Sequence, residues 1–284
     1  MNIVDSGSGP PVVLVPGIQG RWEWLRPGVE ALARHCRVIT FSLADEPTAA
    51  ARFEETSGFG SYVDQVAAAM DQAGLKRATI CGMSYGGLIA AAFAARHPER
   101  TSALVLASAI PASWHPDARV RFYLRAPVLL SPLFCIASAR MYREIAAAAD
   151  GTVAGVRLTA RHGWNALRHM FSPARMARRV QLLNGLALEN ELTAVHVPTL
   201  VLTGEPDLDR VVPVAMTRQY LTIWPHARLA TIPRSGHLGV ITRPAEFARL
   251  VTSFISVEAD RLTPSAVALA KVEGGPYTEV RRIV

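Results

Sequence analysis

Cysteine is scarce in this chain of 284 residues. The three cysteines, Cys36, Cys81 and Cys135, are widely spaced, and no Cys-x-x-Cys pair occurs. This spacing argues against a disulfide framework and against paired-cysteine zinc motifs, and it favours a reducing compartment. The first ten residues also lack the basic and apolar regions of a secretory signal. We therefore expect a cytoplasmic protein.

Long apolar runs are missing as well. The uncharged stretch at 126–139 is interrupted by Pro127 and Pro132, and the stretch at 78–95 is broken in its middle by glycines. A helix that spans a bilayer needs about 20 predominantly apolar residues. We therefore predict no membrane span.

Lysine is almost absent, since Lys76 and Lys271 are the only two, and arginine carries nearly all of the positive charge. The net charge is +7, and the segment 112–192 accounts for +6 of it, with eleven arginines against five acidic residues. Because the excess belongs to one segment rather than to the whole chain, nucleic-acid binding is poorly supported, and we expect a small-molecule partner. The arginines fall at helical spacing, which indicates a solvated helix face, and one or two could meet an anionic substrate.

Three motifs that bind cofactors or metals are also absent. No GxGxxG follows a predicted strand, and the chain contains neither GxxxxGKS/T nor HExxH. Dinucleotide-binding, P-loop and zinc-protease chemistries are therefore not expected. We predict a protein that uses no cofactor and no metal.

What the chain does have is a regular alternation of short apolar runs and helical patterns. The runs are rich in Val, Ile and Leu and stop at turn residues, as buried parallel strands do. This alternation predicts a doubly wound, mostly parallel α/β sheet, in which ligands bind at the carboxyl ends of the strands. The predicted strands are 12–15, 37–41, 78–81, 103–107, 199–202 and 229–232, and the predicted helices are 24–34, 61–73, 88–96, 213–221 and 246–253.

The alternation stops in the middle of the chain, where no strand-like run occurs and Ala, Leu and Arg dominate. Met176, Val180 and Leu183, for example, lie at helical spacing. We predict an all-helical insertion over residues 111–192, with an α/β core formed by 1–110 and 193–257. The remaining residues, 258–284, are polar and lack a long period, which predicts a tail of uncertain order.

The sequence Gly82-Met83-Ser84-Tyr85-Gly86 lies between a predicted buried strand and a predicted helix. A serine at such a sharp strand-to-helix turn takes a strained backbone conformation, and its neighbours two residues away must be small to avoid collision. Gly82 and Gly86 meet that need. The pattern favours Ser84 as a nucleophile at a helix N-terminus, with the Tyr85 N–H aimed at the oxygen of the attacked group. A glycine-rich turn without chemistry is the alternative.

A serine nucleophile needs a general base and an acid that orients the base. Of the eight histidines, His237 follows the last predicted strand at a Ser-Gly pair, so we expect it at the same sheet edge as Ser84. The acid is expected after strand 199–202, where both Asp207 and Asp209 fit and the local pattern does not choose between them. The chain order is then Ser, acid, His.

From about Val4 to Val257 the chain resembles the α/β-hydrolase superfamily, with a helical cap inserted after the sixth family strand. The resemblance implies an α/β-hydrolase fold and a Ser-Asp-His triad. The family's acid commonly stands in Gly-x-x-Asp-x-x-x-Pro, but here the loop is two residues longer. Counting from Gly204 selects Asp207, whereas counting from Pro213 selects Asp209. The residues before Pro213 match the family's entry into the next helix, which implies Asp209.

The resemblance also implies an oxyanion hole, with two departures from the family pattern. The usual His-Gly is replaced by Pro16-Gly17-Ile18, so the backbone N–H of Ile18 is by position the second oxyanion donor beside Tyr85. The family's Asp-x-x-Gly-x-Gly-x-Ser segment is replaced by residues 42–47. An aspartate nucleophile would imply dehalogenase or epoxide hydrolase chemistry, and Ser84 disfavours both.

Together these residues predict a serine hydrolase that cleaves a carboxylic ester with an apolar acyl or alcohol part through an acyl-enzyme. One alternative is a hydrolase of a carbon–carbon bond in a vinylogous diketone acid, whose carboxylate a cap arginine could pair. The other is a non-enzymatic ligand-binding protein on the same scaffold. Aromatic side chains fill helix interfaces more often than pockets. With that alternative open, the candidate substrate contacts are Gln19, Trp22, Trp24, His115 and Trp164.

Overall fold

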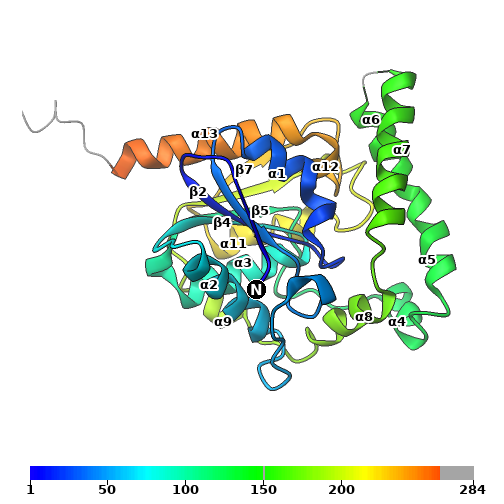
Figure 1. Cartoon of the computed structure of the whole chain (residues 1–284), viewed down its shortest axis with the longest axis horizontal. Helices are drawn as coiled ribbons and strands as arrows, with labels where there is room; N and C mark the ends of the chain where they lie inside the picture. The colour runs from blue at the N-terminus through cyan, green and yellow to red at the C-terminus, as the bar shows by residue number, and fades with distance from the viewer. Residues whose placement is uncertain (150, 263–284) are drawn as a thin grey trace, which may run out of the picture.

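The computed structural model describes residues 1–149 and 151–262. Seven strands form one sheet in the order β1-β3-β2-β4-β5-β6-β7 (Figure 1). Neighbouring strands are parallel except β1, which runs antiparallel to β3. The predicted α/β-hydrolase fold class is thereby confirmed. The strands are β1 (Ile3–Ser6), β2 (Pro11–Val15), β3 (Arg37–Phe41), β4 (Ala78–Met83), β5 (Thr101–Ala107), β6 (Thr199–Thr203) and β7 (Arg228–Thr231).

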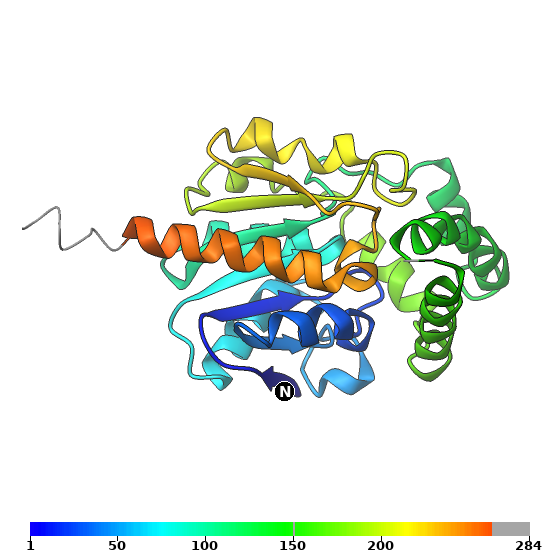
Figure 2. The ribbon, with the colours of Figure 1, turned by 90° about the horizontal axis from the view of Figure 1, so that it is seen from above.

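Helices cover both faces of this sheet (Figures 1 and 2). Helices α1 (Arg26–Leu32) and α13 (Pro244–Leu262) pack on one face, while α2 (Gly60–Gln72) and α3 (Tyr85–Arg96) pack on the other. Successive side chains of a strand point to opposite faces, so a strand covered on both sides must be apolar at every position. Accordingly, Leu14 belongs to one core cluster and Val15 to the other, and both are fully buried. This is why the apolar runs in the sequence predict the central strands correctly.

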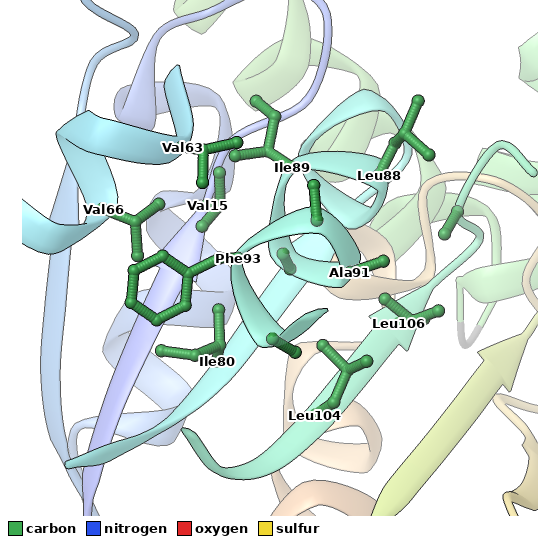
Figure 3. Packing of buried hydrophobic residues seen from close by; sticks show 14 of the residues in the cluster. Val15, Val63, Val66, Ile80, Leu88, Ile89, Ala91, Phe93, Leu104 and Leu106 are labelled. Carbon is green, nitrogen blue, oxygen red and sulfur yellow. The ribbon is translucent and has the colours of Figure 1, made fainter. Parts of the chain in front are cut away.

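The packing around α3 provides a firm base for the β4–α3 turn (Figure 3). Ile89 and Phe93 of α3 lie fully buried against Val15 of β2, Ile80 of β4 and Leu104 of β5. Small residues fill much of the rest of α3, which lets the helix lie close to the sheet. The turn that carries Ser84 is therefore anchored at both ends by dense packing.

The segment between β5 and β6 forms helices and loops in its described residues and contains no strand there. Both views show the green helices α5 to α7 beside one end of the sheet (Figures 1 and 2). We call residues 111–192 the cap. Its helices are α4 (Ala118–Arg125), α5 (Ser131–Ala137), η4 (Ser138–Met141), α6 (Tyr142–Ala148), α7 (Thr152–Arg168), α8 (Pro173–Gln181) and α9 (Glu189–Leu192).

The helix boundaries differ from the sequence prediction in three places. The predicted helix 24–34 divides into η1 (Trp22–Leu25) and α1, and 213–221 divides into α10 (Val214–Thr217) and α11 (Tyr220–Ile223). Helix α13 continues to Leu262, through residues that the sequence pattern assigned to the tail. Glu258 in this extension is 8% exposed and pairs with Arg228 at 2.8 Å, so the extension packs on the core.

The rest of the predicted tail, 263–284, lies outside the described residues. The short elements η2 (Pro47–Ala49), η3 (Pro98–Arg100) and α12 (Gly239–Thr242) complete the description. None of the helices in the described ranges is long and apolar enough to cross a membrane.

Candidate active site

Ser84 occupies the sharp turn between β4 and α3, with φ 55° and ψ −119°. A non-glycine residue with positive φ is strained and persists only where the surroundings enforce it. Here a Cβ at Gly82 would lie 2.1 Å from the Gly86 carbonyl oxygen, so the turn closes only with glycine at that position. The Ser84 N–H donates to the Ala107 carbonyl at 2.9 Å, which ties the turn to β5. The predicted elbow conformation is therefore present.

The loop after β2 lies directly against this turn. A Cβ at Gly86 would lie 2.4 Å from the Pro16 carbonyl oxygen, and a Cβ at Gly17 would lie 3.6 Å from the Ser84 Cβ. Ile18 is therefore in the loop beside Ser84, as the predicted oxyanion role requires. Tyr85 is the first residue of α3, and the first N–H groups of a helix have no partner within it. Both predicted donors stand next to Ser84, and their role remains a proposal.

His237 and Asp209 meet in the loops that follow β7 and β6. His237 Nδ1 lies 3.5 Å from Asp209 Oδ2, and each residue is 6% exposed. The other carboxylate oxygen, Asp209 Oδ1, accepts the N–H groups of Val211 at 3.0 Å and Val212 at 2.9 Å. These bonds fix the carboxylate and leave Oδ2 facing the imidazole. Asp207, by contrast, is exposed, so the geometry favours Asp209 as the acid.

Two glycines bring the loop after β6, which carries Asp209, into backbone contact with the loop after β7, which carries His237 (the histidine loop). A Cβ at Gly204 would lie 2.4 Å from the Gly236 carbonyl oxygen, and a Cβ at Gly236 would lie 2.4 Å from the Leu208 carbonyl oxygen. The Glu205 N–H also donates to the Ser235 carbonyl at 2.7 Å. The relative position of Asp209 and His237 is thus set by backbone packing.

An arginine of the cap binds the backbone of the loop after β2 that carries Ile18. Arg179 of α8 is fully buried, and its Nη1 donates to the Ile18 carbonyl at 2.7 Å. Its Nη2 donates to Asp45 Oδ1 at 2.7 Å and to Glu46 Oε1 at 2.6 Å. Glu46 also accepts from Arg175 at 3.1 Å. This network joins the cap, the loop after β3 and the loop that carries Ile18.

The prediction of a solvated basic face is wrong for this helix. Arg175 and Arg179 bind carboxylates that are at most 2% exposed, and Arg178 pairs with Glu55. The arginine spacing identified the face correctly, but the acidic partners lie more than a hundred residues away in sequence. The sequence feature that could have indicated these partners is the adjacent pair Asp45 and Glu46, in the segment that departs from the family pattern.

A second carboxylate lies beside the histidine loop. Glu144 of cap helix α6 is 1% exposed, and its Oε1 accepts the Leu238 N–H at 2.6 Å. Burial raises the pKa of the Glu144 carboxyl to about 7, although the N–H groups of Gly236 and Leu238 and the His237 ring oppose the rise. The sequence gives no signal for a role of this residue, because it is a lone glutamate in an Ala-rich helix. In residues 1–149 and 151–262, no group of three or more His, Cys, Asp or Glu side chains is placed to hold a metal ion.

A family model described as "Alpha/beta hydrolase family" matches residues 12–250. The chain belongs to this family. A 2-hydroxymuconate semialdehyde hydrolase from Pseudomonas sp. strain CF600 is 30% identical to this hydrolase over 276 residues, covering 91% of each chain. The Caulobacter sp. strain K31 protein named "Putative carbamate hydrolase RutD" is 27% identical over 251 residues, covering 87% of this chain and 91% of its own.

Solved structures show the same fold. The esterase EaEST from Exiguobacterium antarcticum superposes with a TM-score of 0.74 at 18% identity, covering 89% of this chain and 94% of its own. An enol-lactonase from Burkholderia xenovorans LB400 gives a TM-score of 0.71 at 21% identity, covering 90% and 96%. At these identities the comparison concerns the fold of the hydrolase rather than its substrate.

The predicted substrate contacts fall in different surroundings in this hydrolase. Gln19 lies in the loop after β2, where its Oε1 would be 3.4 Å from a Cβ at Gly17. Trp24 joins core to cap, because its Nε1 donates to the His169 carbonyl at 3.1 Å. Trp22 packs under the Arg26 guanidinium.

The two remaining candidates lie in the segment after β5. Trp164 of α7 is 61% exposed and contacts Arg168, and His115 is exposed in the loop that precedes α4. Neither takes part in the described contacts of Ser84, Asp209 or His237. Of the five candidates, Gln19 is therefore the one with a described contact in the loop next to Ser84.

Proposed function

We propose that this protein is a serine hydrolase that cleaves carboxylic esters with an apolar acyl or alcohol part. The observation that carries the proposal is the strained backbone of Ser84, which lies against the loop after β2 that carries Ile18. We call this loop the oxyanion loop. His237 and Asp209 pair at the same edge of the sheet. Strain of this kind costs about 1–3 kcal/mol and is found mainly at functional sites. A glycine-rich turn without chemistry would have no need of it.

The proposed reaction runs in two steps. His237 accepts the Ser84 hydroxyl proton as the oxygen attacks the ester carbonyl, and the N–H groups of Ile18 and Tyr85 stabilise the negative oxygen that forms. Asp209 orients the imidazole and stabilises its positive charge. His237 then gives the proton to the departing alcohol, which leaves an acyl-Ser84 ester. Water, deprotonated by His237, attacks that ester; the bond to Ser84 breaks, the acid leaves, and His237 returns the proton to the Ser84 oxygen.

Hydrolysis of a carbon–carbon bond is the second candidate, because a 2-hydroxymuconate semialdehyde hydrolase is 30% identical over most of both chains. A substrate of the vinylogous diketone acid class carries a carboxylate that needs a cationic partner. Arg179 approaches the oxyanion loop but already binds Asp45 and Glu46, and Arg175 binds Glu46. A substrate carboxylate would therefore have to pair with a different arginine.

A substrate panel tests the choice between the two reactions. We expect turnover of p-nitrophenyl esters, with kcat/KM rising as the acyl chain lengthens from acetate to octanoate, and little turnover of a dienoate diketone acid. Ser84→Ala, measured in parallel, should lose turnover by several orders of magnitude while keeping the wild-type Tm. Preferred turnover of the diketone acid would replace ester cleavage by the second candidate, and an active Ser84→Ala variant would overturn the serine mechanism.

A further inference from the structure

Hydrogen bonds connect α6 of the cap to the histidine loop. Arg234, three residues before His237, donates from Nε to the Ala147 carbonyl at 2.9 Å and from Nη2 to the Ala149 carbonyl. Arg243 Nη1 donates to the Ala148 carbonyl at 3.4 Å. Positive side chains at a helix C-terminus bind its unpaired carbonyls and interact favourably with its dipole. The C-terminal end of α6 is thereby fixed to the loop that carries the catalytic base.

Glu144 completes this contact from the opposite direction. It lies one turn before the carbonyls that the arginines bind, and its carboxylate accepts the N–H of Leu238, the residue directly after His237. With 1% exposure, its charge is poorly screened by water. A carboxylate in this position both fixes the backbone next to the imidazole and acts on the charge of the ring.

We propose that Glu144 is a positioning residue for His237, a second carboxylate that the cap supplies to the histidine loop. This rests on the proposed function, in which His237 accepts the Ser84 proton. Asp209 contacts the ring at Nδ1, whereas Glu144 holds the loop through Leu238 and stabilises the imidazolium that forms during the reaction. In this hydrolase, docking of the cap and activation of the base are therefore connected.

The charges around Glu144 determine how the effect depends on pH. His237 favours ionisation of Glu144, Asp209 opposes it, and Arg234 and Arg243 bind the nearby α6 carbonyls. An ionised Glu144 stabilises the imidazolium that forms in the transition state, whereas the protonated, neutral carboxyl does not. Because burial raises the pKa of Glu144 to about 7, its contribution to the rate should grow as the pH rises through 7.

The test measures the rate of Ser84 labelling by a fluorophosphonate probe from pH 5 to pH 9, which requires no knowledge of the substrate. Glu144→Gln keeps an oxygen that can accept the Leu238 N–H but removes the charge. We expect the ratio of the wild-type rate to the Glu144→Gln rate to rise about threefold between pH 5 and pH 9, as Glu144 ionises in the wild type. Glu144→Leu also removes the acceptor, and its plateau should fall about tenfold. Tm values establish that each variant is folded.

Asp117→Asn is the matched control. Asp117 is also a cap carboxylate that accepts a backbone N–H, that of Val120 at 2.7 Å, but it is exposed at the start of α4. Its profile should equal the wild type. A ratio of wild-type to Glu144→Gln rates that stays constant from pH 5 to pH 9 would overturn the proposal and leave Glu144 a structural residue. Failure of the wild-type protein to react with the probe at any pH would instead overturn the proposed serine mechanism.

Discussion

Removing the Arg179 side chain should destabilise the protein far more than removing that of its neighbour. The guanidinium makes three bonds of 2.6–2.7 Å, to Ile18, Asp45 and Glu46, with no exposed surface of its own. In Arg179→Ala the two carboxylates, at most 2% exposed, lose this partner. Breaking a buried pair in this way costs about 3–5 kcal/mol. For a chain of this size that corresponds to a decrease in Tm of roughly 10 °C.

Arg178→Ala is the control for this experiment. Arg178 belongs to the same helix and pairs with Glu55, whose side chain is 75% exposed, and it lies over the Phe53 ring at 4.4 Å. Exposed pairs contribute about 0–1 kcal/mol and an exposed cation–π contact about as much. We therefore expect a loss of about 1 kcal/mol, within the range of an ordinary surface substitution.

Chemical unfolding of the wild type and both variants, followed by circular dichroism, measures the difference. We predict that the free energy of unfolding of Arg179→Ala is lower than that of Arg178→Ala by at least about 2 kcal/mol. We also predict that Arg179→Lys recovers only part of the loss, because an ammonium cannot reproduce the guanidinium fork. Equal stability of the two alanine variants would refute the idea that a buried ionic network supports the oxyanion loop.

Three further predictions concern the acid, the second carboxylate and the loop contact. Asp209→Asn should lower ester turnover by orders of magnitude and the exposed Asp207→Asn should not; the opposite result would assign the acid to Asp207. Because the folded state binds the Glu144 proton more tightly than the unfolded chain, the free energy of unfolding of the wild type relative to Glu144→Gln should fall by up to about 3 kcal/mol as the pH rises from 4.5 through 7. Urea unfolding at pH 5 and pH 8 measures this, and a constant difference would contradict it. Gly236→Ala should lower turnover at least about tenfold, because its Cβ would meet the Leu208 carbonyl; wild-type kcat/KM would contradict the proposed backbone contact.

The α/β core was predictable because its signals are local. Strands buried on both faces must be continuously apolar, and the glycines around Ser84 are required by the turn itself, so both features appear within a few neighbouring residues. The candidate triad then followed from the loops at the strand ends. The local pattern could not separate Asp209 from Asp207, because the difference between them is burial; the choice of Asp209 rested on the family resemblance.

The contacts between the cap and the core could not be predicted in the same way. Arg179 and Glu144 have the spacing and composition of solvated helix residues, and only the tertiary structure places them against Asp45 and Leu238. Long-range ion pairs leave no periodic signal, since each partner is a single residue in an unrelated segment. The positive charge of the cap is thus in part a means of attachment to the core, rather than a surface that faces water.

Ser84 is the proposed nucleophile of this hydrolase. Incubation with a fluorophosphonate, followed by peptide mass spectrometry, tests this role directly. We predict a single phosphonylated residue, Ser84, and no labelling of a folded Ser84→Ala variant. Labelling at a different serine, or undiminished labelling of Ser84→Ala, would contradict it.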